Sequence, residues 1–302
     1  MLHFLLFGPI ASCMKSTNFG YIPALDHLRG FAAVLVLFFL IPFGMTVLLS
    51  FQVTKLYQVA WSWDLTTWKD VFSHSYYWVI MARTLKMALI CVVLCVFLGL
   101  PVAYALVNRL PSMENHVKIL IVFAFLADAI LKTFGWVLFF DRSGVLNGFL
   151  EVLGFGPAAS DILFTPTAAM IAMVYNLLPY TIFTIYLSMM RIDRDLIAAS
   201  YDSGASKLRT FWEITLPLSK PGLLAGAVLV FVLGLGVFLE PKIMGGGTSP
   251  LAAELIRQTF ETRVNWPLGA ALTIVVIGIG ALTLMFFGYL LIKTTKSQGG
   301  NT

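Results

Sequence analysis

Residues 191–220 read RIDRDLIAASYDSGASKLRTFWEITLPLSK and separate two long apolar segments of the chain. This stretch is too polar to lie in hydrocarbon and too long for a simple connection. Asp195 can cap a helix that runs through Ala198 and Ala199, and Gly204 can end that helix in a left-handed turn. The stretch therefore predicts a short helix followed by a sharp turn.

A second short helix is predicted to start at Ala205. It places Leu208, Phe211 and Trp212 on one face, at spacings of i, i+3 and i+4, and Pro217 is expected to end it. An apolar stripe of this kind suits insertion into a groove of another protein, and it equally suits a connector that rests on lipid headgroups. The residues alone leave both interpretations open.

The rest of the chain is strongly apolar. Of its 302 residues, 59% are hydrophobic and only 12% are charged, and the mean hydropathy is +0.88. The apolar residues form blocks long enough to cross about 30 Å of hydrocarbon as helices of about 20 residues. The sequence therefore predicts an all-α, polytopic membrane protein with about six transmembrane helices, near residues 31–51, 84–107, 117–140, 165–190, 219–243 and 268–292.

The distribution of Lys and Arg predicts the orientation. Six crossings put both termini on one side, and the segments on that side hold eleven Lys and Arg, against six in the opposite loops. We therefore expect both termini to be cytoplasmic, with residues 1–30 as an extension and 294–302 as a tail. The net charge of +5 does not indicate a nucleic-acid partner, because no exposed basic cluster is interleaved with stacking aromatic residues.

Ionisable residues inside predicted spans are candidate pathway residues, because a charge in hydrocarbon is costly. Asp128 lies midway along the third predicted span with Lys132 one turn later, and Glu240 and Lys242 end the fifth. A cationic substrate would favour carboxylates backed by aromatic faces. Alternatively, Asp128 and Lys132 neutralise each other, and Glu240 lies with Lys242 at the outer interface. The candidate substrate-pathway residues are Asp128, Tyr175, Tyr180, Phe238 and Glu240.

The polar segment resembles a known signature. Permeases of bacterial ABC importers carry the pattern E-A-A-x3-G-x9-I-x-L-P, which Ala199, Gly204, Ile214, Leu216 and Pro217 match at the full spacing. The resemblance covers roughly residues 31–293 and is closest to the spermidine/putrescine permeases of the type I family. The matching stretches include Phe164-Thr165-Pro166, Leu177-Leu178-Pro179-Tyr180, Met244-Gly245-Gly246 and Trp266-Pro267-Leu268-Gly269. Two positions depart from the pattern, because Ala198 replaces the glutamate and Ser200 replaces the second alanine.

The resemblance implies a type I permease fold in the bacterial inner membrane, with residues 191–218 docking onto an ATPase. It implies two copies of an ATP-binding subunit, a second, related permease subunit, and a periplasmic substrate-binding protein. The chain itself would bind no cofactor, since ATP and magnesium would lie in the ATPase. The residues expected to couple to the ATPase are Ala198, Ala199, Ser200, Asp202, Gly204, Ala205, Leu208, Phe211, Ile214, Leu216 and Pro217.

The implied activity is ATP-driven import of polyamines or related small amines. The same class of importer also takes amino-acid derivatives, phosphonates, iron carriers or sulfate, and a secondary transporter is the main rival class. An enzyme is not expected, because the sequence has no H-E-x-x-H pair and no G-x-x-x-x-G-K-[ST] phosphate loop. All four histidines fall outside the predicted spans, and no metal site is expected.

Overall fold

A computed structural model describes residues 36–38, 40–55, 58–60, 62–108, 119, 123, 126–155, 161–247 and 250–299. The chain divides into two compact units, residues 1–49 and 50–302. Within the first unit, the structure describes an apolar helix over Val36–Leu49, inside the predicted span 31–51. The predicted extension 1–30 lies outside the described residues.

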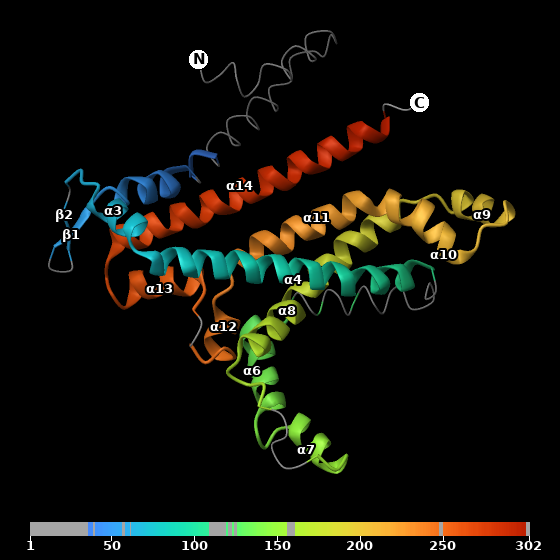
Figure 1. Cartoon of the computed structure of the whole chain (residues 1–302), viewed down its shortest axis with the longest axis horizontal. Helices are drawn as coiled ribbons and strands as arrows, with labels where there is room; N and C mark the ends of the chain where they lie inside the picture. The colour runs from blue at the N-terminus through green and yellow to red at the C-terminus, as the bar shows by residue number, and fades with distance from the viewer. Residues whose placement is uncertain are drawn as a thin grey trace, which may run out of the picture. The chain divides into compact units, whose positions relative to one another are not determined.

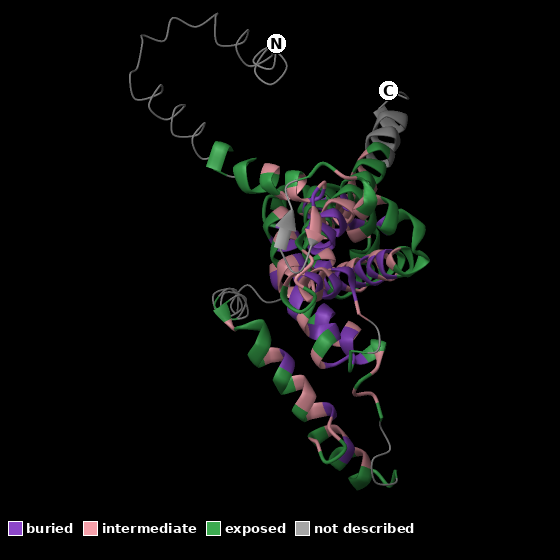
Figure 2. Ribbon diagram, turned by 90° about the vertical axis from the view of Figure 1, so that its left-hand side faces the viewer, coloured by how far each residue is buried: buried purple, intermediate pink, exposed green. Residues whose placement is uncertain are grey.

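Three long helices form the centre of the second unit (Figure 1). Helix α8 (Pro166–Met189) packs against both α4 (Ser75–Asn108) and α11 (Leu216–Leu235), which also pack against each other. Within the apolar window of α8, 56% of the residues are buried, against 22–33% in the other long apolar helices. Figure 2 shows the buried residues concentrated in this bundle. Because α8 has neighbours on several sides, it is the central helix of the unit.

Small residues let α11 approach α8 closely. A Cβ atom at Gly222 would collide with Ser188 of α8, and one at Gly226 would collide with Thr184. The Ser188 hydroxyl also accepts a hydrogen bond from the backbone N–H of Gly222, at 3.3 Å. Close packing of this kind is a main source of helix association in lipid, where hydrophobic burial between helices adds little.

A fourth long helix, α14 (Trp266–Gly299), packs against α3 (Thr66–Ser73) and α13 (Ala252–Glu261). A two-stranded antiparallel hairpin of β1 (Val53–Lys55) and β2 (Gln58–Ala60) precedes α3, with Val53 opposite Ala60. The Thr84 hydroxyl of α4 accepts a 2.8 Å hydrogen bond from the backbone N–H of Ala252. This bond ties α13 to the central bundle.

The third predicted span, 117–140, is not one continuous helix. The chain bends at 127–128, and α6 (Ala129–Phe140) begins there, followed by α7 (Val145–Val152). The Asp128 carboxylate accepts a hydrogen bond from the backbone N–H of Ile130 at 2.6 Å and so caps α6. Aspartate at a helix start satisfies a donor that has no partner within the helix. The prediction that Asp128 lies midway along a helix is therefore wrong.

The fifth predicted span, 219–243, also differs at both ends. Helical structure begins with α10 (Lys207–Thr210), passes through a π-helical turn η3 (Phe211–Thr215) and continues as α11. Pro217 therefore does not end the helix as predicted. The Leu216 N–H donates to the Phe211 carbonyl five residues back. Pro217 has no N–H and so leaves a carbonyl of the preceding turn without its helical donor, and the widened π turn accommodates this gap.

At its other end α11 stops at Leu235, and Glu240 lies in a separate short helix, α12 (Leu239–Ile243). The sixth predicted span corresponds to α14, which runs on to Gly299 and so makes most of the predicted tail helical. The described residues contain four helices long and apolar enough to cross a membrane: Ser75–Asn108, Pro166–Met189, Lys207–Leu235 and Trp266–Tyr289. The all-α, polytopic fold class is confirmed.

Candidate functional site

The polar segment 191–218 folds into two helical pieces joined by a tight turn. Helix α9 (Arg194–Asp202) is capped by Asp193, whose carboxylate accepts from the Asp195 N–H at 3.0 Å. Asp195, which we predicted to be the cap, lies instead in the first turn, where its charge is favourable to the helix dipole. Gly204 has a φ of +83°, so the predicted left-handed turn is confirmed.

A serine–threonine pair holds the two pieces together. The Ser200 and Thr210 hydroxyl groups lie 2.9 Å apart, and Thr210 also donates to the Ser206 carbonyl at 3.1 Å. The Ser206 side chain caps α10 by accepting from the Arg209 N–H at 3.3 Å. Ser200, one of the two departures from the importer signature, thus has a structural role. Sequence reasoning missed it, because Thr210 is not part of the signature.

Much of the segment is exposed. No residue of α9 is buried, and the side chains of Leu208 and Trp212 are 68% and 59% exposed. Phe211 turns toward the bundle instead, edge-on to Tyr104 of α4 at 5.0 Å between ring centroids. The predicted single stripe is therefore divided, with two apolar side chains facing outward and one anchoring the segment.

The other predicted coupling residues follow the same division. Ala205, Ile214 and Leu216 are half-buried, and the remaining ones are exposed: Ala198, Ala199, Asp202, Gly204 and Pro217. A hollow of about 340 Å³ lies where α9 meets the ends of α4 and α8. Its walls include Val107, Met190 and Ile197, with Arg194 among the polar groups. Figure 1 shows α9 and α10 at the opposite end of the bundle from α3 and the hairpin.

A polar centre lies inside the bundle. Glu240 is only 5% exposed, and its carboxylate accepts a 2.7 Å hydrogen bond from the side-chain amide of Asn176, which is 6% exposed. These residues are 64 positions apart, on α12 and α8. Sequence reasoning selected Glu240 and missed Asn176, because a single amide in an apolar helix carries no spacing signal. The carboxylate is therefore enclosed by protein and is not exposed at the surface of the bundle.

Lys132 is one cation near this centre. Partial burial disfavours the Lys132 ammonium, and the charges of Glu240 and Asp128 offset part of that cost. Helix α6, which carries Lys132, packs against both α8 and α12. The structure therefore brings Lys132 near both acids, although Asp128 itself is exposed.

The predicted aromatic residues have several different neighbours. Tyr175 lies edge-on to Trp136 of α6 at 5.4 Å between ring centroids. The Phe238 ring is covered by the guanidinium of Arg257, 5.9 Å from the ring centroid. Tyr180 packs against the apolar core between α4, α8 and α11. Among these, Phe238 already has a cation on its face.

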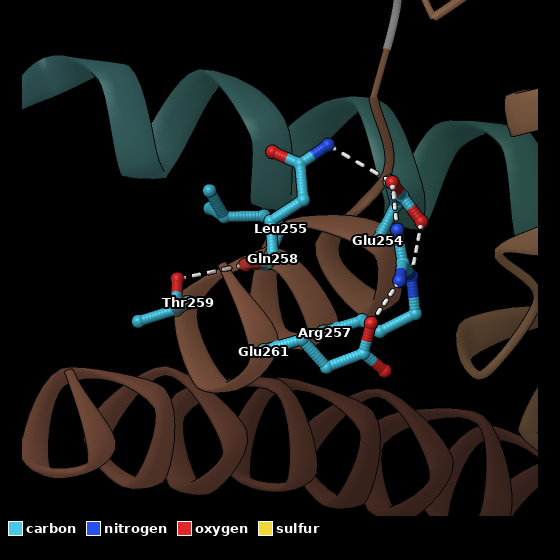
Figure 3. A network of polar contacts seen from close by, with 6 residues as sticks. All are labelled: Glu254, Leu255, Arg257, Gln258, Thr259 and Glu261. Atoms are coloured by element: carbon cyan, nitrogen blue, oxygen red, sulfur yellow. Dashed lines mark hydrogen bonds and ion pairs between the residues drawn. The ribbon is translucent and has the colours of Figure 1, made fainter. Parts of the chain in front are cut away.

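Arg257 belongs to a charged network on α13 (Figure 3). Its guanidinium donates two 2.9 Å hydrogen bonds to Glu254 and also pairs with Glu261, while Gln258 donates to Glu254 at 2.9 Å. Burial raises the pKa of Glu254, but the hydrogen bonds from Arg257 and Gln258 outweigh burial and hold the pKa below its ordinary value. The network lies within α13 and keeps the buried Glu254 carboxylate charged.

In the part of the chain that the structure describes, no three His, Cys, Asp or Glu residues lie close enough to hold a metal ion.

Residues 86–296 match the family described as "Binding-protein-dependent transport system inner membrane component". The chain belongs to this family. It is a permease subunit of an ABC importer, a multi-pass protein of the inner membrane, and a transporter component rather than an enzyme.

Two relatives illustrate the similarity. The spermidine/putrescine transport system permease protein PotB of Escherichia coli (strain K12) is 34% identical over 211 residues, which cover 70% of this chain and 77% of that protein. PotB of Haemophilus influenzae is 30% identical over 205 residues, covering 68% of this chain and 72% of that protein.

A solved bacterial alginate ABC transporter, in complex with its pentasaccharide-bound periplasmic protein, shares the fold of this chain. Its matching chain superposes with a TM-score of 0.72 at 15% identity, over 96% of this chain and 98% of that one. The predicted ABC importer permease fold is therefore confirmed. Family and fold also support the general kinds of partner, a periplasmic binding protein and an ATPase.

Proposed function

We propose that this permease subunit imports polyamines such as spermidine and putrescine. The observation that carries the proposal is the 34% identity to a spermidine/putrescine permease along 70% of the chain. The buried carboxylate of Glu240 supports it independently, because a cationic amine would favour a negative charge inside the bundle. The same carboxylate disfavours phosphonate and sulfate, since like charges repel.

The segment 191–218 would dock onto the ATPase. No residue of its first helix is buried, and its second helix presents Leu208 and Trp212 outward. Exposed tryptophan is a typical anchor of protein interfaces. The π turn and α11 continue the docking helix directly into the bundle, so movement of the segment would be carried to the helices around Glu240.

The complete importer would contain two copies of the ATP-binding subunit, a second, related permease chain and the periplasmic binding protein. ATP and magnesium would bind to the ATPase. The low buried share of α4, α11 and α14 leaves apolar faces that suit lipid and a second permease. Both termini would be cytoplasmic, in agreement with the excess of Lys and Arg on that side of the predicted topology.

Within the bundle, Glu240 would contact the substrate, with Asp128, Tyr175, Tyr180 and Phe238 along the pathway. Their positions near α6, α8 and α12 support this arrangement. Glu240 has the strongest support, because it is buried and hydrogen-bonded while Asp128 is exposed and caps a helix.

The test is uptake by the complete importer in proteoliposomes, with ATP inside and the binding protein outside. We expect spermidine and putrescine to be accumulated and to stimulate ATP hydrolysis, and we expect sulfate and a phosphonate to do neither. Stimulation by an anion alone would show that the polyamine assignment is wrong. Uptake driven by an ion gradient without ATP would instead favour a secondary transporter.

A further inference from the structure

The orientation of the Asn176 amide follows from its partner. A carboxylate only accepts hydrogen bonds, so the NH₂ group of Asn176 must face Glu240, as the 2.7 Å contact shows. The carbonyl oxygen of the same amide then points away from that contact. This Oδ1 atom is buried, and it has no hydrogen-bond partner among the described residues.

An unpaired acceptor in this position is costly. Leaving a buried polar group without a partner costs about 1–3 kcal/mol. Asn176 could have been a leucine, which fits an apolar helix of this kind better. The amide instead places one acceptor beside a carboxylate, and this combination suits a ligand that has both a positive charge and an N–H donor.

Glu240 needs a positive charge nearby, and Lys132 is placed to supply it. A buried carboxylate is stable only when it is paired or hydrogen-bonded. Helices α6, α8 and α12, which carry Lys132, Asn176 and Glu240, all contact one another. Partial burial disfavours the Lys132 ammonium, and the charges of Glu240 and Asp128 offset part of that cost, so the lysine gains from pairing with either acid. Since Asp128 lies one helical turn from Lys132, the lysine has a second carboxylate to which it can shift.

We propose that Asn176 and Glu240 form a binding site for a primary or secondary ammonium group. In the absence of substrate, Lys132 pairs with the Glu240 carboxylate. This inference rests on the proposed import of amines. The incoming ammonium donates one hydrogen bond to the Asn176 carbonyl oxygen and pairs with Glu240. Lys132 then shifts its pairing toward Asp128.

The site selects between two classes of cation. A primary ammonium carries three N–H donors, so it can satisfy Asn176 and Glu240 together. A quaternary ammonium has the same charge and no N–H, so it leaves the amide oxygen unpaired. We therefore expect the site to reject quaternary amines even when their length and charge match those of a polyamine.

The test measures binding of radiolabelled spermidine to the complete permease–ATPase complex in nanodiscs of neutral phosphatidylcholine, without the binding protein. Loss of a hydrogen bond to a charged group costs about 1.5–3 kcal/mol, and 1.4 kcal/mol is a factor of ten. We expect Asn176→Leu and Glu240→Gln each to raise the dissociation constant by about tenfold or more. We expect Lys132→Met to lower it, because the competing cation is removed.

Two matched controls isolate the site. Thr181→Val removes another buried oxygen on α8 that has no partner among the described residues, and it should leave spermidine binding unchanged. Lys69→Met removes an exposed cation on α3 and should also have no effect. A competition experiment on the unmodified complex needs no variant: putrescine should displace spermidine, and hexamethonium, which is bis-quaternary, should not.

Three results would overturn the inference: unchanged binding in Asn176→Leu, weaker binding in Lys132→Met, or equal competition by hexamethonium. Each of these can occur while the importer still accumulates spermidine, in which case the proposed function stands and only the site is wrong. If the unmodified importer takes up no amine, the proposed function itself fails.

Discussion

The proposed docking segment, residues 191–218, and the Asn176–Glu240 centre are built in opposite ways. The docking segment is exposed and is held mainly by contacts within about ten residues, such as the bond between Ser200 and Thr210. The polar centre is buried and joins residues 64 positions apart. The first can be recognised from a short stretch of sequence, and the second exists only once α8 and α12 have packed together. The predictions that follow test this contrast.

The largest effect is expected at Trp212. Its exposed ring contributes little to the fold, so Trp212→Ala should leave membrane insertion and thermal stability unchanged while weakening ATPase binding by about 2 kcal/mol or more. Co-purification and affinity of the ATP-binding subunit measure this. Trp63→Ala is the control, because Trp63 is also exposed but lies before α3, away from the docking segment. If Trp212→Ala also lowered the thermal stability of the permease, the ring would be supporting the fold instead.

A substitution at Gly226 should act on the opposite region. Gly226→Val would place a side chain against Thr184, and overpacking of this kind costs about 1–3 kcal/mol. We expect a lower unfolding temperature for the purified complex and reduced uptake. Gly278→Ala is the matched control, since a Cβ atom at Gly278 has open space around it and should cost nothing. A stable Gly226→Val protein would mean that α8 and α11 are less closely packed.

Gly204 tests the turn of the docking segment. Its φ of +83° is strained for any residue with a side chain, although no neighbour would obstruct one, so Gly204→Val should cost about 1–2 kcal/mol locally. We expect strongly reduced uptake with normal insertion. Gly204→Asn should retain more transport, because asparagine adopts the left-handed conformation more readily. Equal transport by both variants would argue against a conformational role for the turn.

The smallest effect is expected at Glu254. Its pKa is lowered in the folded protein, so its contribution to stability is present above the ordinary glutamate pKa and is lost as the pH falls through the lowered value. Glu254→Gln should therefore destabilise the complex at pH 7 by about 1 kcal/mol or less. Thermal unfolding at several pH values should show the difference from the unmodified protein shrinking in acid. Glu261→Gln, at a more exposed carboxylate, should show a weaker dependence.

Several features were predictable because they depend on neighbouring residues. The span 165–190 corresponds closely to α8, and the left-handed turn at Gly204 is present. Errors arose where two local signals compete. Asp193 and Asp195 are both good helix caps, and Pro217 normally ends a helix but here follows a π turn. Asp128 looked like a buried charge within a span, whereas a break in the helix lets it act as a cap.

Sequence alone determined the membrane environment and the importer family, and it singled out residues 191–218 as the segment proposed to dock onto the ATPase, because hydropathy, motif spacing and turn chemistry are local properties. Only the tertiary structure showed that Ser200 braces the segment and that Phe211 turns inward onto Tyr104. The pairing of Asn176 with Glu240, and the approach of Lys132, likewise come from packing between α6, α8 and α12. A buried charge needs partners in space, and no sequence spacing specifies which distant helix provides them.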